Sequence, residues 1–294
     1  MHKDHMKTRL SLLLHLIIVS SFLCTSAAAQ QNPWDIKLPF KEATVEYSIT
    51  GSETGTETLY IKDYGKERAK RRTSTSKMMF MTTATDQLEI TNPDWIYTID
   101  MKAGSGTKVT NPVKYILAEY DRLSAGEKTM VNKNAQEIGA SALGGMQGSV
   151  QQNAANILGY DCDLVSMGGT NVYSIHGTDI TLKSEMKTMG MNFSTVVTSI
   201  KQGAVADSMF APPAGVPVTH DQEADEAAKA MAKSTMDTLK SPDASRKMKE
   251  QAGSAMQQGA PAGDQQGVPA EQMDQETAQE MQKAMDAVKG LFGK

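Results

Sequence analysis

The chain has 294 residues, and its 34 Asp and Glu residues outnumber its 30 Lys and Arg residues, which gives a formal net charge of −4. An acidic chain lacks the basic surface that nucleic acids require, so we expect no nucleic-acid partner. With only 2 cysteines, the chain cannot build a disulfide framework, and an apolar core must stabilise the fold.

Residues 1–29 have the three parts of a secretory signal peptide. A short basic segment is followed by an apolar run over 10–23, and small residues at 26–29 provide the cleavage site. The apolar run is shorter than the about 20 residues that span a bilayer as a helix, and we find no longer apolar stretch after it. We therefore predict an exported periplasmic protein without a transmembrane segment, cleaved after Ala29.

Cys24 raises the alternative of a lipoprotein anchor. Lipoprotein processing requires a small residue just before the cysteine, whereas this chain has Leu23, so we do not expect lipidation.

Cleavage after Ala29 removes three basic residues and one acidic residue, which leaves 27 Lys and Arg against 33 Asp and Glu. Cys162 is then the single cysteine of the mature chain, and no intramolecular disulfide can form.

After a lead-in over residues 30–37, the pattern from 38 to 110 is that of β-strands. Ala43, Val45, Tyr47 and Ile49 alternate with polar residues, which indicates a strand with one buried face. Further strands are predicted at 56–64, 67–80, 87–91 and 95–101, and the strand over 67–80 begins with several basic residues. Short strands separated by Gly, Asn and Asp turns favour an antiparallel sheet or barrel.

The middle of the chain, from 112 to 146, predicts one or two helices. Ser124 and Glu127 have the spacing of a capping box, in which a helix start is closed by two reciprocal hydrogen bonds. The strand pattern returns from 157 to 203. A Pro- and Gly-containing segment at 210–215 then closes a domain that we place at 38–219.

Residues 220–294 form a tail rich in Ala, Gln and Met. Two stretches, 221–239 and 271–289, are predicted to be helical, and a Gly- and Pro-rich linker separates them. The second stretch has a narrow apolar stripe, which suits either a helix that packs on the domain or one that binds a protein partner or a membrane surface. The acidic residues on its polar face argue against binding to anionic lipid.

Catalytic and metal-binding motifs are lacking. His176 and His220 have no Cys or His at metal-ligand spacing, and the chain contains neither a phosphate-binding glycine loop nor a G-x-S-x-G nucleophile motif. Cys162 lies between Asp161 and Asp163, whose charges disfavour a reactive thiolate, so we interpret it as a small buried residue of a strand. We therefore expect a non-enzymatic protein with no catalytic, cofactor-binding or metal site.

Methionines gather in two groups, which allow two readings. The groups are Met78, Met79 and Met81, and Met186, Met189 and Met191. Thioethers bind Cu(I), so a periplasmic copper-binding protein is one alternative. Flexible methionines that line an apolar cavity for a lipid are the other.

Four segments resemble a known family. Residues 157–162 match an "I-x-G-Y-x-C" strand entry, 180–191 match a hairpin, 205–215 match a "v-x-d-x-x-F-x-x-P-x-G" ending, and 95–100 fit the same plan. Together they resemble uncharacterised exported proteins similar to the bacterial periplasmic lipoprotein-localisation carriers. The resemblance covers about 38–219 and leaves out the tail.

The resemblance implies an α+β fold, mainly β, in which a half-open antiparallel barrel is capped by the central helices. In the carriers the cavity of that barrel holds acyl chains. We therefore expect a non-enzymatic protein that binds a lipid or lipidated peptide by burial of apolar area. The alternatives are an envelope interaction or stress protein that binds a protein partner through residues 220–294, and the Cu(I)-binding protein.

Overall fold

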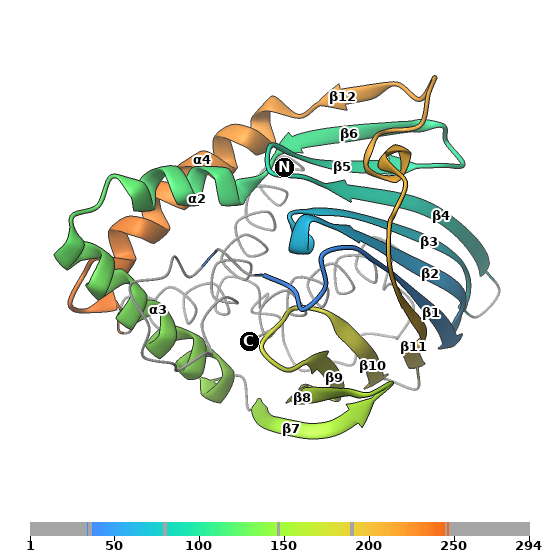
Figure 1. Ribbon diagram of the computed structural model, residues 1–294, viewed down its shortest axis with the longest axis horizontal. Helices are drawn as coiled ribbons and strands as arrows, with labels where there is room; N and C mark the ends of the chain where they lie inside the picture. Colours follow the sequence, from blue (N-terminus) through green and yellow to red (C-terminus); the bar gives the residue numbers. More distant parts are fainter. Residues whose placement is uncertain are drawn as a thin grey trace, which may run out of the picture.

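The computed structural model describes residues 34, 37–78, 81–145, 148–188, 191–244 and 246. These residues fold into one 12-stranded sheet and three α-helices, so the α+β class and the predominance of strands are confirmed (Figure 1). The predicted signal peptide, the Gly- and Pro-rich linker and the helix predicted at 271–289 lie outside the described residues. Within them, no helix is long and apolar enough to cross a membrane.

Six strands come from the first part of the chain and six from the second. The first six are β1 (Ala43–Gly51), β2 (Glu53–Lys62), β3 (Glu67–Met78), β4 (Met81–Thr91), β5 (Trp95–Asp100) and β6 (Ser105–Thr110). The others are β7 (Ser149–Ile157), β8 (Tyr160–Met167), β9 (Thr170–Ile175), β10 (Thr181–Thr188), β11 (Met191–Gln202) and β12 (Val218–His220). The sequence pattern predicts strands again only from 157, whereas β7 begins at Ser149.

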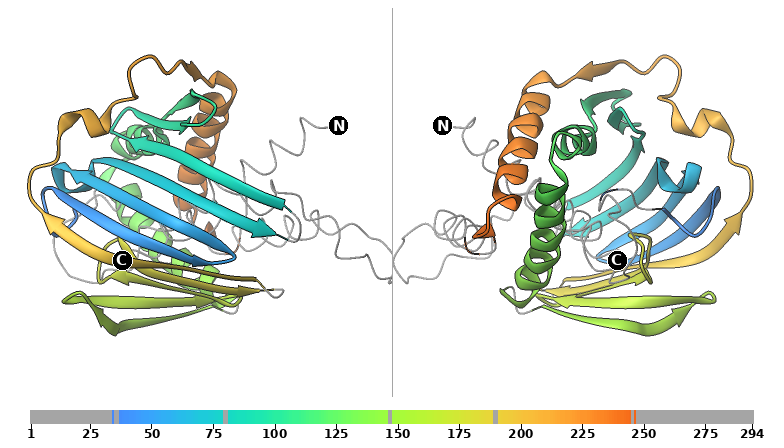
Figure 2. Two further views of the ribbon diagram at one scale, coloured as in Figure 1. Left: turned by 90° about the vertical axis from the view of Figure 1, so that its right-hand side faces the viewer. Right: turned by 60° about the vertical axis from the view of Figure 1, so that its left-hand side comes forward.

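The sheet is open, with the order β12-β6-β5-β4-β3-β2-β1-β11-β10-β9-β8-β7. All neighbouring strands are antiparallel except β12 and β6, which are parallel. The sheet is strongly curved, and the helices lie across its open side (Figures 1 and 2). The helix side of the sheet is therefore its concave face.

Three helices form the second layer: α2 (Pro112–Asp121), α3 (Ala125–Gly145) and α4 (Gln222–Leu239). The predicted capping box starts α3, because the Ser124 N–H donates to Glu127 at 2.9 Å and the Glu127 N–H reaches the Ser124 hydroxyl at 3.4 Å. α4 confirms the helix predicted at 221–239, and the domain boundary predicted at 219 lies within β12.

The helices share a core of their own. Ile116 and Tyr120 of α2 and Val131 of α3 pack with Met236 and Leu239 of α4, and each is at most 3% exposed. A second apolar cluster lies on the concave face of the sheet and is separate from the helical one. The closest association of a helix with the sheet is between α4 and β6, the strand next to the edge strand β12.

Asp225 joins α4 to β6. Its carboxylate accepts hydrogen bonds from the Thr110 N–H at 2.6 Å and the Thr110 hydroxyl at 2.7 Å, and it pairs with Nε2 of His220 at 2.6 Å. Asp225 is 8% exposed. One carboxylate therefore holds the end of β6, the end of β12 and the first turn of α4 together.

The convex face carries the segment that links β11 to β12. This segment includes a 3-10 helix, η2 (Asp207–Phe210), and its Val205 and Phe210 pack on Ala69 and Ile90. The predicted closing segment at 210–215 therefore covers the outside of the sheet, and the concave face is left to the helices.

Candidate functional site

Both histidines singled out in the sequence pair with a carboxylate. Nδ1 of His176 lies 2.8 Å from Asp163, and Nε2 of His220 lies 2.6 Å from Asp225. Among the residues that the structure describes, no three His, Cys, Asp or Glu side chains are grouped so that they could hold a metal ion. These pairs fix the turn after β9 and the start of α4, which is a structural role.

The remaining singled-out residues are only partly visible. Cys162 is fully buried, and burial raises the pKa of its thiol to about 11, as expected for a structural cysteine. Met186 is buried on β10 and Met191 is half-buried on β11. The side chains of Met78 and Met81, and all of Met79 and Met189, lie outside the described residues, so the two methionine groups stay predictions.

A surface hollow of about 360 Å³ lies on α4. Its lining consists of Ala230, Lys233, Ser234, Asp237 and Thr238, most of which are polar. An open, polar depression on a helix does not suit an acyl chain, which gains its binding energy by leaving water. The concave face of the sheet is a better candidate.

The strand register shows which residues share that face. Val45 pairs with Leu59, which pairs with Lys70. Tyr47 pairs with Glu57, which pairs with Arg72. Directly opposed residues of neighbouring strands point to the same side of a sheet, so apolar residues of β1 and charged residues of β3 lie on one continuous face.

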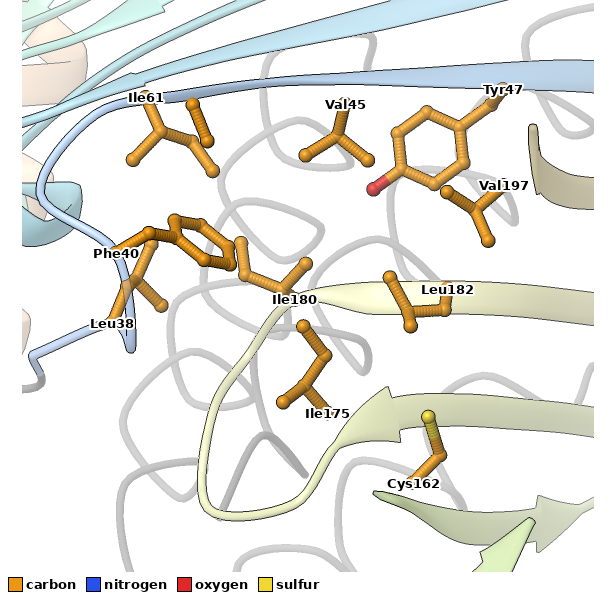
Figure 3. Close-up of a cluster of buried hydrophobic side chains, with 11 residues drawn as sticks. Leu38, Phe40, Val45, Tyr47, Ile61, Cys162, Ile175, Ile180, Leu182 and Val197 are labelled. Carbon is orange, nitrogen blue, oxygen red and sulfur yellow. The ribbon is translucent and has the colours of Figure 1, made fainter. Parts of the chain in front are cut away.

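One half of the concave face is apolar (Figure 3). It is formed by β1, β8, β9, β10 and β11, by the end of β2 and by residues 38–40 before β1. Its buried members are Leu38, Phe40, Ala43, Val45, Tyr47, Ile61, Cys162, Ile175, Ile180, Leu182 and Val197. Figure 3 shows Tyr47 and Val45 on one side of the cluster and Leu182 and Ile175 on the other. Phe193, opposite Met186 and Gly51, extends this half along β11.

The other half, over β2, β3 and β4, carries charges that we call the charged strip: Glu53, Glu57, Arg68, Lys70, Arg72 and Glu89, joined by Asp179 from the turn before β10. Arg72 is the centre of the strip. Its guanidinium donates to Glu53 at 2.7 and 3.1 Å and to Glu57 at 3.0 Å. Lys70 lies 3.6 Å from Glu89. Arg68 donates to both oxygens of Asp179 at 2.5 and 3.0 Å.

The charges at the centre of the strip are shielded from water. The side chains of Arg72, Glu53 and Glu57 are each 13–14% exposed. Burial also raises the pKa of Tyr47, which lies where the apolar half meets the strip, and the charge of Glu57 raises it further. One part of the concave face is therefore apolar and buried, and the other part is charged and partly buried. An amphipathic ligand, with an apolar end and a polar end, matches this division.

Sequence reasoning did not find the charged strip. The basic start of the strand at 67–80 is visible in the sequence, but its acidic partners are contributed by three other segments. Arg71, the next residue after Lys70, points to the convex face and pairs there with Asp86 at 3.0 Å. The alternation of side chains along β3 could have predicted that Arg71 and Arg72 lie on opposite faces. The acidic partners of Arg72 could not be predicted, because they depend on the register between neighbouring strands.

No family model matches the chain, and no curated protein matches its sequence. Among solved structures, an uncharacterized conserved protein from Thermus thermophilus is similar at a TM-score of 0.38 and 6% identity, over 62% of this chain and 92% of that chain. PNGF-II is similar at 0.33 and 12% identity, over 65% of this chain and 32% of that chain. LprF from Mycobacterium bovis is similar at 0.26 and 13% identity, over 69% of this chain and 97% of that chain. These scores are too low to establish a shared fold, and function is argued from the chain's own faces.

Proposed function

We propose that the protein is a non-enzymatic, exported binding protein that takes up an amphipathic lipid or lipidated peptide on the concave face of its sheet. The observation that carries the proposal is the division of this face into an apolar half and a charged strip. An acyl chain placed over the apolar half gains about 0.8 kcal/mol for each buried CH₂ group. No catalytic group is required for such binding.

The arrangement of the two layers supports this placement. The helical core and the concave cluster are separate apolar groups, and the helices associate with the sheet mainly at the β6 edge (Figure 2). The concave cluster is therefore not part of the packing between the helices and the sheet, which supports the concave face as the place for a ligand. Leu38 and Phe40, in the segment before β1, belong to the same apolar half and would lie beside the ligand.

The direct test is native mass spectrometry of the exported protein, purified without detergent from the host envelope. We expect adducts of lipid mass that disappear after solvent extraction, and we expect the extracted protein to bind a fluorescent fatty acid. Adducts of copper mass would instead support the Cu(I) alternative. A protein that yields no lipid and binds no fatty acid refutes the proposal.

A matched pair of variants locates the binding face. Phe193→Ala removes a half-buried ring from the apolar half, and we expect it to weaken binding of the fluorescent fatty acid by about tenfold, the equivalent of about 1.4 kcal/mol. Leu158→Ala is the control, because Leu158 is 53% exposed at the turn between β7 and β8. Equal affinities of the two variants would exclude the apolar half as the site.

A further inference from the structure

The alternation of β3 separates two neighbouring arginines by face. Arg72 lies on the concave face, where its side chain is 13% exposed. Arg71 lies on the convex face, where its side chain is 49% exposed and pairs with Asp86. Arg71 therefore forms an ordinary surface ion pair, whereas Arg72 of the same strand is largely buried on the concave face.

The charged strip is not needed for the fold. Ion pairs that are shielded from water gain little stability, because desolvation of the charges offsets most of their attraction, and apolar residues of similar volume often replace them without loss. β1, in the same sheet, already fills its concave side with Val45, Tyr47 and Ile49. The charges of β2, β3 and β4 therefore point to binding.

Ser74 provides an independent sign of a missing partner. It lies two residues after Arg72 on the same face of β3, it is 4% exposed, and its hydroxyl has no hydrogen-bond partner in the described part of the chain. Across from it stands Gly55, where a Cβ atom would lie 2.2 Å from the Thr73 carbonyl oxygen, so the two strands approach each other closely there. A buried hydroxyl without a partner costs free energy unless a ligand satisfies it.

The signs of the charges define the ligand group. Arg72, two residues from Ser74, and Lys70, four residues from it on the same face of β3, supply two positive charges, and Glu53, Glu57 and Glu89 supply three negative charges. A purely anionic group that approached Arg72 would also meet the carboxylates of Glu53 and Glu57, which lie within 3.1 Å of its guanidinium. A group that carries both a phosphate and an ammonium matches both signs.

We propose that the charged strip with Ser74 is a headgroup site for a zwitterionic phospholipid, with the phosphate beside Arg72, Lys70 and the Ser74 hydroxyl and the ammonium beside Glu57 and Glu53. This inference rests on the proposed function, since it places the polar end of the lipid whose acyl chain lies on the apolar half. It adds the class of lipid that the site selects.

Three probes with the same palmitoyl chain test it by calorimetric titration of the full exported chain: lysophosphatidylethanolamine, lysophosphatidylglycerol and palmitate. We expect the ethanolamine lipid to bind at least about tenfold more tightly than the glycerol lipid. Equal affinities, or tighter binding of the glycerol lipid, overturn the headgroup site and leave the proposed function standing. Failure of all three probes to bind overturns both.

Variants assign the discrimination to the strip. Glu57→Gln keeps the size of the side chain and removes one negative charge, and we expect it to abolish the preference for the ethanolamine lipid. Arg71→Gln on the convex face is the control and should leave the preference unchanged. If a thermal melt shows that Glu57→Gln is unfolded, Ser74→Ala replaces it as the test, because a hydroxyl without a partner is not needed for folding. A loss of about threefold in the affinity of Ser74→Ala for the ethanolamine lipid supports the site, and an unchanged affinity overturns it.

Discussion

Replacement of Asp225 by alanine should be among the most damaging single changes outside the apolar clusters. The carboxylate accepts two hydrogen bonds from Thr110 and pairs with His220, and all three distances are 2.6 or 2.7 Å. A hydrogen bond to a charged group contributes about 1.5–3 kcal/mol, and alanine also leaves the Thr110 N–H without its acceptor. We expect Asp225→Ala to lower the free energy of unfolding by roughly 3–5 kcal/mol.

Urea unfolding followed by circular dichroism measures this loss. Asp237→Ala on the same helix is the matched control, because Asp237 is 48% exposed and pairs only with Lys233 and Lys240 in the described residues. A surface pair of this kind contributes less than about 1 kcal/mol. If Asp225→Ala destabilises the protein no more than Asp237→Ala does, the carboxylate does not hold α4 to β6 and the reasoning fails.

The pH dependence of stability tests the same residue through a second variant, Asp225→Asn, and follows from the pKa of Asp225. Burial raises this pKa, but the hydrogen bonds from Thr110 and His220 together outweigh burial and hold it below its ordinary value of 3.8. The folded state therefore prefers the carboxylate, and its contribution is complete above the pKa of the unfolded chain and is lost as the pH falls through the folded-state pKa. The stability difference between the wild type and Asp225→Asn should shrink as the pH is lowered below 3.8.

Three further substitutions and one labelling reaction test the packing. Ser74→Ala should leave the free energy of unfolding unchanged or raise it by up to about 1 kcal/mol, because the buried hydroxyl has no partner among the described residues. A clear loss of stability would reveal a hydrogen bond of this hydroxyl that the structure lacks. Gly55→Ala should destabilise the protein by about 1–3 kcal/mol because its Cβ would overlap the backbone of β3. Gly126→Ala in α3 is the control and should stabilise the protein by about 0.5–1 kcal/mol, because nothing lies within 4 Å of the added Cβ. Equal effects of the two substitutions would contradict the close approach of β2 and β3 at Gly55. Cys162, with its thiol pKa raised to about 11, should resist iodoacetamide at neutral pH in the folded protein and react once the protein is unfolded in urea; rapid labelling of the native state would show that the thiol is accessible.

Much of the sheet could be predicted from the sequence where a strand buries one face. β1 alternates apolar and polar residues because its concave side is buried and its convex side faces water, and the pattern was plain. β7 was not predicted as a strand from its start, because it is the edge strand and residues 151–154 are exposed on both faces. Without a buried face there is no alternation to read, and its Gln and Asn residues look like those of a loop.

The candidate site could not be predicted from the sequence, because it depends on how the strands pair. A strand's own sequence gives the alternation of its side chains, whereas the charges that each side chain meets depend on which strands lie beside it and in which register. Glu57 meets Arg72 only because β2 and β3 pair with Glu57 opposite Arg72. Asp179 meets Arg68 across 111 residues of chain, a contact that the curvature of the sheet produces.

The dimensions of the concave face connect the charged strip with the proposed ligand. From β3 across β2 and β1 to β11 there are three strand spacings, and β10 adds a fourth. At about 4.8 Å per spacing, the path along the sheet from Arg72 to the apolar half over β10 and β11 is roughly 15–19 Å. Half of a bilayer's hydrocarbon core is about 15 Å thick, so one acyl chain has the length of this path. A lipid with its headgroup over β3 would therefore place its chain over Tyr47 and Val197, where the face is apolar, and the order of the strands would set the orientation of the proposed ligand.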